Sequence, residues 1–195
     1  MRFLLVDNFD SFTYNIVHYL EKSNVEVVVR TNESVDLNEI PSFAAVVLSP
    51  GPGLPKDAGL LMKVIVVATK IGLPIFGICL GMQALAQWEG SELYNQQQVK
   101  HGVAEWINIS SKNSRLYTGI ADKIEVGLYH SWAIHLKFQS EFIPTAYSDN
   151  NVLMSFENPE KLIFGVQYHP ESILTPNGIQ IIQNFIKIVQ DSLLD

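Results

Sequence analysis

Residues 73–81 read Leu-Pro-Ile-Phe-Gly-Ile-Cys-Leu-Gly and join an apolar run to a segment of helical periodicity. The apolar run up to Ile78 predicts a buried strand, and the pattern from Leu80 to Trp88 predicts a helix. Cys79, with a glycine two residues to either side, stands at the junction. A sharp strand-to-helix turn holds a reactive side chain clear of its neighbours and against a helix N-terminus. The stretch therefore predicts an α/β fold with a cysteine nucleophile at the turn.

Strands and helices alternate along the first half of the chain. Apolar runs interleaved with helical patterns are typical of a doubly wound, mostly parallel sheet of the flavodoxin-like kind. In such sheets ligands bind beyond the carboxyl ends of the strands. The pattern predicts strands at residues 2–6, 25–30, 43–48 and 74–78, and helices at 12–22, 59–70 and from 80 onward.

The second half carries short alternating segments between polar turns, at residues 104–109, 124–130 and 152–156. These predict antiparallel strands added to the main sheet rather than a second domain. An amphipathic helix follows Asn177-Gly178 and closes the chain. We therefore expect a single domain over residues 1–195. The predicted apolar face of the last helix consists of Ile179, Ile182, Phe185, Ile186 and Val189.

A second group of reactive residue types follows the apolar segment 162–168, which predicts a buried strand. His169-Pro170-Glu171 comes directly after it. Residues two apart in an extended segment point the same way, and Pro170 keeps His169 out of the helical region. His169 and Glu171 can therefore face one site, as the base and the orienting group that a cysteine nucleophile needs. The alternative is a histidine that ends a strand beside a solvated glutamate.

The loop Ser49-Pro50-Gly51-Pro52-Gly53 follows the predicted strand 43–48. Its glycines and prolines make a stiff turn whose backbone N–H groups can point outward and donate to a developing oxyanion. The alternative is a plain turn, which is what most Pro-Gly repeats form. This loop, Cys79 and His169 each follow a strand, so we expect all three at one rim of the sheet.

Composition limits the possible partners. The 195 residues carry a net charge of −7, and the pI is about 5.2, which argues against nucleic acid or an anionic membrane as partner. The single cysteine excludes an internal disulfide and suits the cytoplasm. No signal peptide is apparent, and no run approaches the ~20 apolar residues of a membrane span. The five histidines lack the spacing of a zinc site, so we expect no metal.

Taken together, the cysteine elbow, the Pro-Gly-Pro-Gly loop and the His-Pro-Glu motif resemble the class I (triad) glutamine amidotransferases over essentially the whole chain. The resemblance implies that Cys79 attacks the side-chain amide of glutamine, with His169 as general acid and base and Glu171 as its partner. It implies the backbone N–H groups of Gly51 and Leu80 as oxyanion donors, and no cofactor. The substrate-binding residues that it implies are Gly51, Pro52, Gly53, Gln83, Ser131 and Trp132.

The opening Leu-Val-Asp-Asn-Phe-Asp-Ser-Phe-Thr-Tyr-Asn at residues 5–15 narrows the resemblance. It is similar to the amidotransferase subunits that serve anthranilate synthase and 4-amino-4-deoxychorismate synthase, and residues 129–132 and 167–175 point the same way. For Asp10 and Ser11 the simpler local alternative is helix capping. Nothing in the sequence resembles an acceptor site for ammonia. The resemblance thus implies a glutaminase subunit that hands ammonia to a chorismate-using synthase subunit, with anthranilate synthase as the leading choice.

Two hypotheses from other classes stay open at this point. One is a stand-alone cysteine hydrolase of amides or peptides, and the other is a flavodoxin-like binding module in which Cys79 is only packed. One departure from the family pattern is Met82, where the family commonly has histidine. Residues 94–105, which include Lys100-His101-Gly102, resemble a family segment near the synthase interface, and the alternative is a solvated face.

Overall fold

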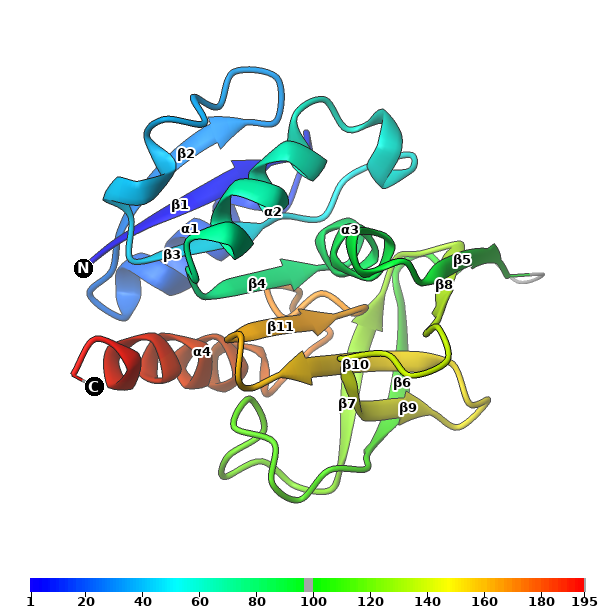
Figure 1. Ribbon diagram of the computed structural model, residues 1–195. Coiled ribbons are helices and arrows are strands. Elements are labelled where there is room, and N and C mark those ends of the chain that lie inside the picture. Colours follow the sequence, from blue (N-terminus) through cyan, green and yellow to red (C-terminus); the bar gives the residue numbers. More distant parts are fainter. Residues whose placement is uncertain (97–99, 195) are drawn as a thin grey trace.

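The computed structural model describes residues 1–96 and 100–194, so residues 97–99 of the predicted interface segment lie outside the described residues. The main sheet has nine strands in the order β2-β1-β3-β4-β11-β10-β9-β6-β7 (Figure 1). It runs through both halves of the chain. A separate two-stranded sheet pairs β5 with β8.

One half of the main sheet is parallel, from β2 to β11. Its strands are β1 (Arg2–Asp7), β2 (Glu26–Thr31), β3 (Ala45–Leu48), β4 (Ile75–Ile78) and β11 (Ile163–Val166). The helices between them are α1 (Thr13–Lys22), α2 (Leu61–Lys70) and α3 (Leu80–Glu89), with short 3-10 turns η1 (Ile40–Ser42) and η2 (Pro55–Asp57). The predicted doubly wound α/β architecture is confirmed.

The other half of the sheet is antiparallel, as predicted for the second half of the chain. Its strands are β10 (Leu153–Asn158), β9 (Ile143–Ser148), β6 (Val103–Ile109) and β7 (Lys123–Leu128). The sequence pattern did not predict β9, which contains a proline, a residue that removes one ladder donor. It also missed β5 (Glu92–Asn95) and β8 (Trp132–His135), which are only four residues long each.

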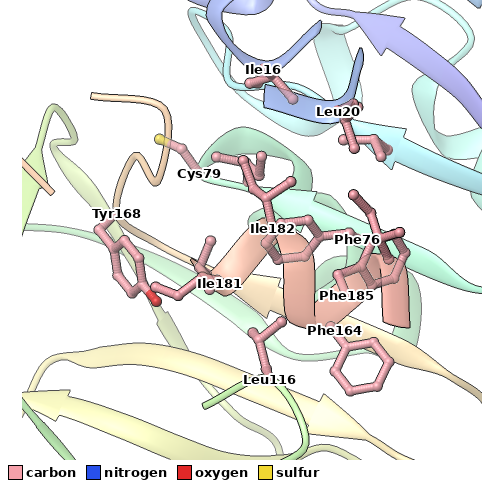
Figure 2. Packing of buried hydrophobic residues seen from close by; sticks show 14 of the residues in the cluster. Ile16, Leu20, Phe76, Cys79, Leu116, Phe164, Tyr168, Ile181, Ile182 and Phe185 are labelled. Carbon is pink, nitrogen blue, oxygen red and sulfur yellow. The ribbon is translucent and has the colours of Figure 1, made fainter. Parts of the chain in front are cut away.

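Helices cover both faces of the parallel half. Alternate residues of β1 point to opposite faces, so Phe3 packs on the side of α1 and α4 (Gly178–Ser192), and Leu4 packs on the side of α2 and α3. On the first face, Phe76 of β4 and Phe164 of β11 lie against Phe185 of α4 (Figure 2). The strands that carry the rim loops are therefore held from both sides.

The buried face of α4 differs from the predicted stripe. Ile179 is only half-buried, whereas Ile181 and Ile188 are buried. The buried face is shifted because α4 also packs against the segment around Leu116. The Asn184 side chain donates to the carbonyl oxygen of Leu116 at 2.8 Å. Residues 181, 184 and 188 share one side of the helix, and that side packs against this segment.

The carboxyl ends of β1, β3, β4 and β11 meet at one rim, because these four strands are parallel neighbours. The loops that leave them contain the Asp10 segment, the Ser49–Gly53 loop, Cys79 and His169, in that order. The predicted convergence on one rim is present. None of the described helices has the length and apolar character that crossing a membrane requires.

Candidate active site

Cys79 occupies a strained turn between β4 and α3. Its backbone has φ 51° and ψ −102°, in the region that side-chain-bearing residues rarely adopt and that costs about 1–3 kcal/mol. Two backbone hydrogen bonds hold the turn: the Cys79 N–H donates to Val166 at 2.8 Å, and the Cys79 carbonyl accepts from Gln83 at 3.0 Å. The turn is the elbow that the sequence predicted.

The flanking glycines let the strand and the helix approach closely. A Cβ on Gly77 would lie 2.6 Å from the carbonyl carbon of Gly81, and a Cβ on Gly81 would lie 2.4 Å from the carbonyl oxygen of Leu48. Real Cβ atoms do not come this close to backbone. Any other residue at either position would force the strand and the helix apart.

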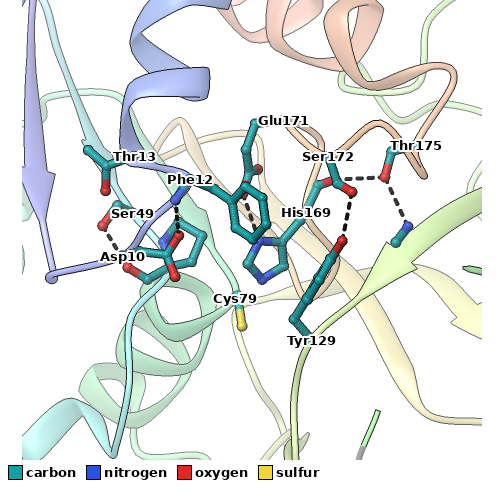
Figure 3. Close-up of polar contacts among 12 residues, drawn as sticks. Asp10, Phe12, Thr13, Ser49, Cys79, Tyr129, His169, Glu171, Ser172 and Thr175 are labelled. Carbon is teal, nitrogen blue, oxygen red and sulfur yellow. Dashed lines mark hydrogen bonds and ion pairs between the residues drawn. The ribbon is translucent and has the colours of Figure 1, made fainter. Parts of the chain in front are cut away.

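His169 and Glu171 form a buried pair beside Cys79. The Nδ1 atom of His169 lies 2.6 Å from Oε1 of Glu171, and both side chains are almost fully buried. Figure 3 shows the imidazole between the Glu171 carboxylate and the Cys79 sulfur. The other ring nitrogen, Nε2, is buried and has no hydrogen-bond partner among the described residues. It is thus available to exchange a proton with the sulfur or with a substrate.

The surroundings of His169 favour its protonated form. Burial by itself would lower the pKa of His169, but Cys79 and Glu171 on either side raise that pKa to about 10. An imidazole that is protonated near neutral pH pairs with a cysteine thiolate, and this is the usual way in which a cysteine nucleophile is activated. The geometry and the electrostatics agree on this pairing.

A cavity of about 500 Å³ opens onto Cys79 and His169. The rings of Phe12 and Tyr129 flank the imidazole, with centroids 5.9 Å and 4.7 Å from its own. The Tyr129 hydroxyl is fixed by a 3.1 Å hydrogen bond with Ser172. The remaining lining residues are Phe9, Asp10, Ser11, Pro50, Gly51, Pro52 and His101.

The acidic residues of the opening segment shape the β1–α1 loop. Asp7 accepts hydrogen bonds from the Phe9 N–H at 2.9 Å and from the Thr13 hydroxyl at 2.7 Å, and Asp10 accepts from the Phe12 N–H at 2.7 Å. They therefore order the turn before α1, but the capping alternative for Asp10 and Ser11 is wrong, because Phe12 is the N-cap and no side-chain hydrogen bond caps this helix. Ligand-type atoms of Asp10, His169 and Glu171 also lie within 4.8 Å of one another. The expectation that no metal takes part stays a prediction.

Gly51 and Leu80, whose N–H groups are the implied oxyanion donors, lie close together. Leu80 is the first residue of α3, so its N–H has no partner inside the helix. Gly51 approaches it so closely that a Cβ there would lie 2.9 Å from the Leu80 side chain and 2.5 Å from Cβ of Asn8. The Asn8 N–H and side chain hold the loop through Ser49, each at 2.9 Å. Gly51 thus packs against Leu80, the residue that follows Cys79, and the role of the two N–H groups as oxyanion donors stays a prediction.

The other residues that the resemblance implied for substrate binding are placed differently. Pro52 lines the cavity, but among the described residues Gly53, Gln83, Ser131 and Trp132 do not. Gly53 is exposed, and Ser131 and Trp132 are half-buried. Gln83 is buried, and its side-chain nitrogen donates to the Trp132 carbonyl at 3.1 Å. The structure therefore brings Gln83 and Trp132 together, outside the set of residues that line the cavity.

Sequence reasoning missed Gln167. This side chain is fully buried, and its nitrogen lies 3.5 Å from the Cys79 sulfur. The available signal was a polar residue inside the otherwise apolar segment 162–168. Met82, the departure from the family pattern, is fully buried and packs over Gly165, where a Cβ would lie 2.7 Å from its Cγ. It is a core residue of α3 and not part of the cavity lining.

Comparison with known proteins gives the family. Residues 4–189 match the family model described as glutamine amidotransferase class-I. The chain belongs to the class-I glutamine amidotransferases. The resemblance drawn from the motifs is thereby confirmed.

Relatives of this amidotransferase extend over nearly its full length. Anthranilate synthase component II of Haloarcula marismortui is 37% identical over 187 residues, which are 93% of this chain and 95% of the relative. Aminodeoxychorismate/anthranilate synthase component 2 of Bacillus subtilis is 35% identical and covers 98% of both chains. A solved structure of a glutamine amidotransferase from Thermotoga maritima shares the fold, with a TM-score of 0.78 at 18% identity over 100% of this chain and 84% of that one.

Proposed function

We propose that this amidotransferase is the glutaminase subunit of anthranilate synthase, which hydrolyses L-glutamine and delivers ammonia to a chorismate-using synthase subunit. The observation that carries the proposal is the buried His169–Glu171 pair beside the strained Cys79. The names of the relatives favour this partner. The Bacillus subtilis relative is named for both synthases, so 4-amino-4-deoxychorismate synthase is the second candidate.

The first chemical step is attack by the Cys79 thiolate on the carbonyl carbon of the glutamine side-chain amide. A C–S bond forms, and the carbonyl oxygen becomes an oxyanion. The backbone N–H groups of Gly51 and Leu80 donate to this oxyanion. Each donor of this kind contributes about 10² to 10³ in rate.

His169 then gives its proton to the amide nitrogen, the C–N bond breaks, and ammonia leaves. The remaining thioester is hydrolysed by a water molecule whose proton returns to His169, and glutamate is released with the thiolate restored. Glu171 holds the ring in the orientation in which Nε2 faces the reaction, because Nδ1 is occupied by its carboxylate. Phe12 and Tyr129 restrict the ring from both sides.

Exposed apolar side chains, one of them in the cavity wall, support a protein partner. Ile173, two residues after Glu171, is 93% exposed, and Phe9, at the cavity wall, is 55% exposed. Tyr14 and Val103 are also exposed. A partner docked here would bury apolar area and would separate the released ammonia from water. The single cysteine and the acidic pI fit a complex in the cytoplasm, without nucleic acid or membrane.

Replacement of the nucleophile in the reconstituted complex tests the proposal. We expect Cys79→Ala to abolish glutamine-dependent product and to leave ammonia-dependent product intact. Identification of the product as anthranilate or 4-amino-4-deoxychorismate decides between the two partners. Loss of both activities would show that this chain does more than deliver nitrogen.

The hypotheses from other classes predict different results. A stand-alone hydrolase would turn over amides other than glutamine without a partner. A glutamine-analogue electrophile would not label a binding module, and the Cys79→Ala variant of such a module would behave as wild type. Intact mass spectrometry after treatment with such an electrophile, with and without free glutamine, separates all three: only the proposed function expects one label that glutamine blocks.

A further inference from the structure

A buried series of polar groups ends at the Cys79 sulfur. It begins at the backbone carbonyl of Trp132, which accepts from the Gln83 side-chain nitrogen at 3.1 Å. The same nitrogen donates to Oε1 of Gln167 at 3.0 Å. The nitrogen of Gln167 then lies 3.5 Å from Sγ of Cys79. The series joins β8, α3 and the segment after β11 to the elbow.

Hydrogen-bond chemistry fixes the direction of this series. A backbone carbonyl can only accept, so the Gln83 group that faces Trp132 must be the NH₂ group. The Gln167 atom that receives the second Gln83 hydrogen must then be the carbonyl oxygen. The NH₂ group of Gln167 is left to face the sulfur, and it can only donate.

Burial makes the opposite orientation costly. Gln167 is fully buried and Gln83 is 3% exposed, so water cannot replace a hydrogen-bond partner that either side chain loses. A flipped Gln167 would set its NH₂ group against the NH₂ group of Gln83 and its oxygen against the sulfur. Each buried polar group left without a partner costs about 1–3 kcal/mol. The donating orientation is therefore locked.

We infer that Gln167 is a catalytic residue whose side-chain N–H stabilises the thiolate form of Cys79, and that Gln83 is a positioning residue that keeps Gln167 donating. The inference rests on the proposed role of Cys79 as nucleophile. A hydrogen bond to a charged acceptor favours the charged form, and such bonds are stronger than neutral ones. Gln83 then acts on Cys79 through Gln167, which is the residue between them in the series.

Other charged or titratable groups line the cavity onto which the sulfur opens, or pair with His169, and they stay the same in the variants below. They come from the segment after β11, the β1–α1 loop, the end of β7 and the turn before β6. These groups are His169, Glu171, Asp10, Tyr129 and His101. A change that follows substitution of Gln167 alone can therefore be assigned to the lost donor.

The test measures the rate at which iodoacetamide alkylates Cys79, from pH 5 to pH 10, in the full chain. Because Cys79 is the only cysteine, intact mass reports a single site. We expect Gln167→Met, of similar volume but without a donor, to raise the pH of half-maximal alkylation by about one unit. The rate at neutral pH should fall about tenfold. Gln190→Met, at an exposed position of α4, is the matched control and should behave as wild type.

Two further variants keep the test decisive if Gln167→Met does not fold. Gln167→Glu keeps the shape but sets a carboxylate oxygen against the sulfur, so its midpoint should rise at least as far. Gln83→Met should give a smaller rise, because Gln167 is then free to turn. Unchanged midpoints in folded variants would overturn the inference. Failure of the proposed function looks different: wild-type Cys79 would itself react as an ordinary thiol, with its midpoint at the usual value.

Discussion

His169 and Glu171 face each other across Pro170, with Nδ1 of the ring 2.6 Å from Oε1 of the carboxylate. The second carboxylate oxygen, Oε2, is buried and has no partner among the described residues. The negative charge is therefore directed at the ring and is little screened. It fixes which ring nitrogen is left for the reaction, and it contributes to the raised pKa of His169.

Glu171→Gln should separate the charge of this carboxylate from its shape. The glutamine oxygen can still accept from Nδ1, but the imidazolium loses its counter-charge, so the pKa of His169 falls. We expect glutamine hydrolysis by the complex to drop by about 10² to 10⁴ in kcat, with little change in KM. Glutamate release measures it, and Glu160→Gln at an exposed position is the control. Activity within a factor of two of wild type would contradict the role of Glu171.

Gly81→Ala should damage the elbow without touching the reacting groups. The new methyl group would lie 2.4 Å from the carbonyl oxygen of Leu48, so α3 must move away from β3. We expect the free energy of unfolding to fall by about 1–3 kcal/mol, as for other overpacked sites. Urea unfolding measures the loss, and Gln87→Ala on the same helix serves as the control. A variant as stable as wild type would show that the elbow has room that the structure does not indicate.

Much of the fold could be predicted because, in the first half of the chain, the hydrophobic periodicity and the turn residues indicate the same element boundaries. The strands that became β3 and β4 contain no polar side chain, β1 is apolar between its end residues Arg2 and Asp7, and each is followed by a loop or helix signal. The sequence pattern did not predict β5 and β8, because each is only four residues long and mixes polar with apolar residues. The width of the α4 face could not be predicted either, because it depends on the distant Leu116 segment.

The candidate site likewise contains residues that the sequence could predict and residues that it could not. Cys79, His169 and Glu171 could be predicted because each stands next to a local signal, a glycine pair or a proline at a strand end. Gln167 could not be assigned, because its importance lies in contacts to Cys79 and Gln83, which are 88 and 84 residues away. Such long-range hydrogen bonds leave no periodicity in the sequence. Phe12 and Tyr129 of the cavity wall were missed because their ring contacts with His169 also join distant parts of the chain.

Ile173→Asp should weaken docking of the synthase subunit. Ile173 is 93% exposed and lies two residues from Glu171, so a partner that covers the cavity would bury it. A charge there would be desolvated on binding, and we expect the Kd of the complex to rise at least tenfold. Phe138→Asp is a matched control: Phe138 is 91% exposed, but its neighbour Lys137 contacts Glu89 at the far end of α3. Calorimetry measures both, and equal effects would place the partner elsewhere.

His130 should make the fold sensitive to mild acid. Burial lowers the pKa of His130 to about 4, and the Trp132 carbonyl, 2.8 Å from Nδ1, offsets this only in part. In the unfolded chain the pKa of a histidine is about 6.5. Between these values the unfolded chain binds a proton that folded His130 does not, so the free energy of unfolding is unaffected above pH 6.5 and falls as the pH drops toward 4.

The loss that His130 contributes should reach on the order of 3 kcal/mol at pH 4, from the difference between the two pKa values. Carboxylates also titrate in this range, so the measurement is a comparison of urea unfolding at pH 7 and pH 4 for wild type and for His130→Gln. We expect the variant to lose less stability between the two pH values than wild type does. His18→Gln, at an exposed position, should keep the wild-type difference. Equal losses in wild type and His130→Gln would contradict the low pKa of folded His130, because protonation of this residue would then not be coupled to unfolding.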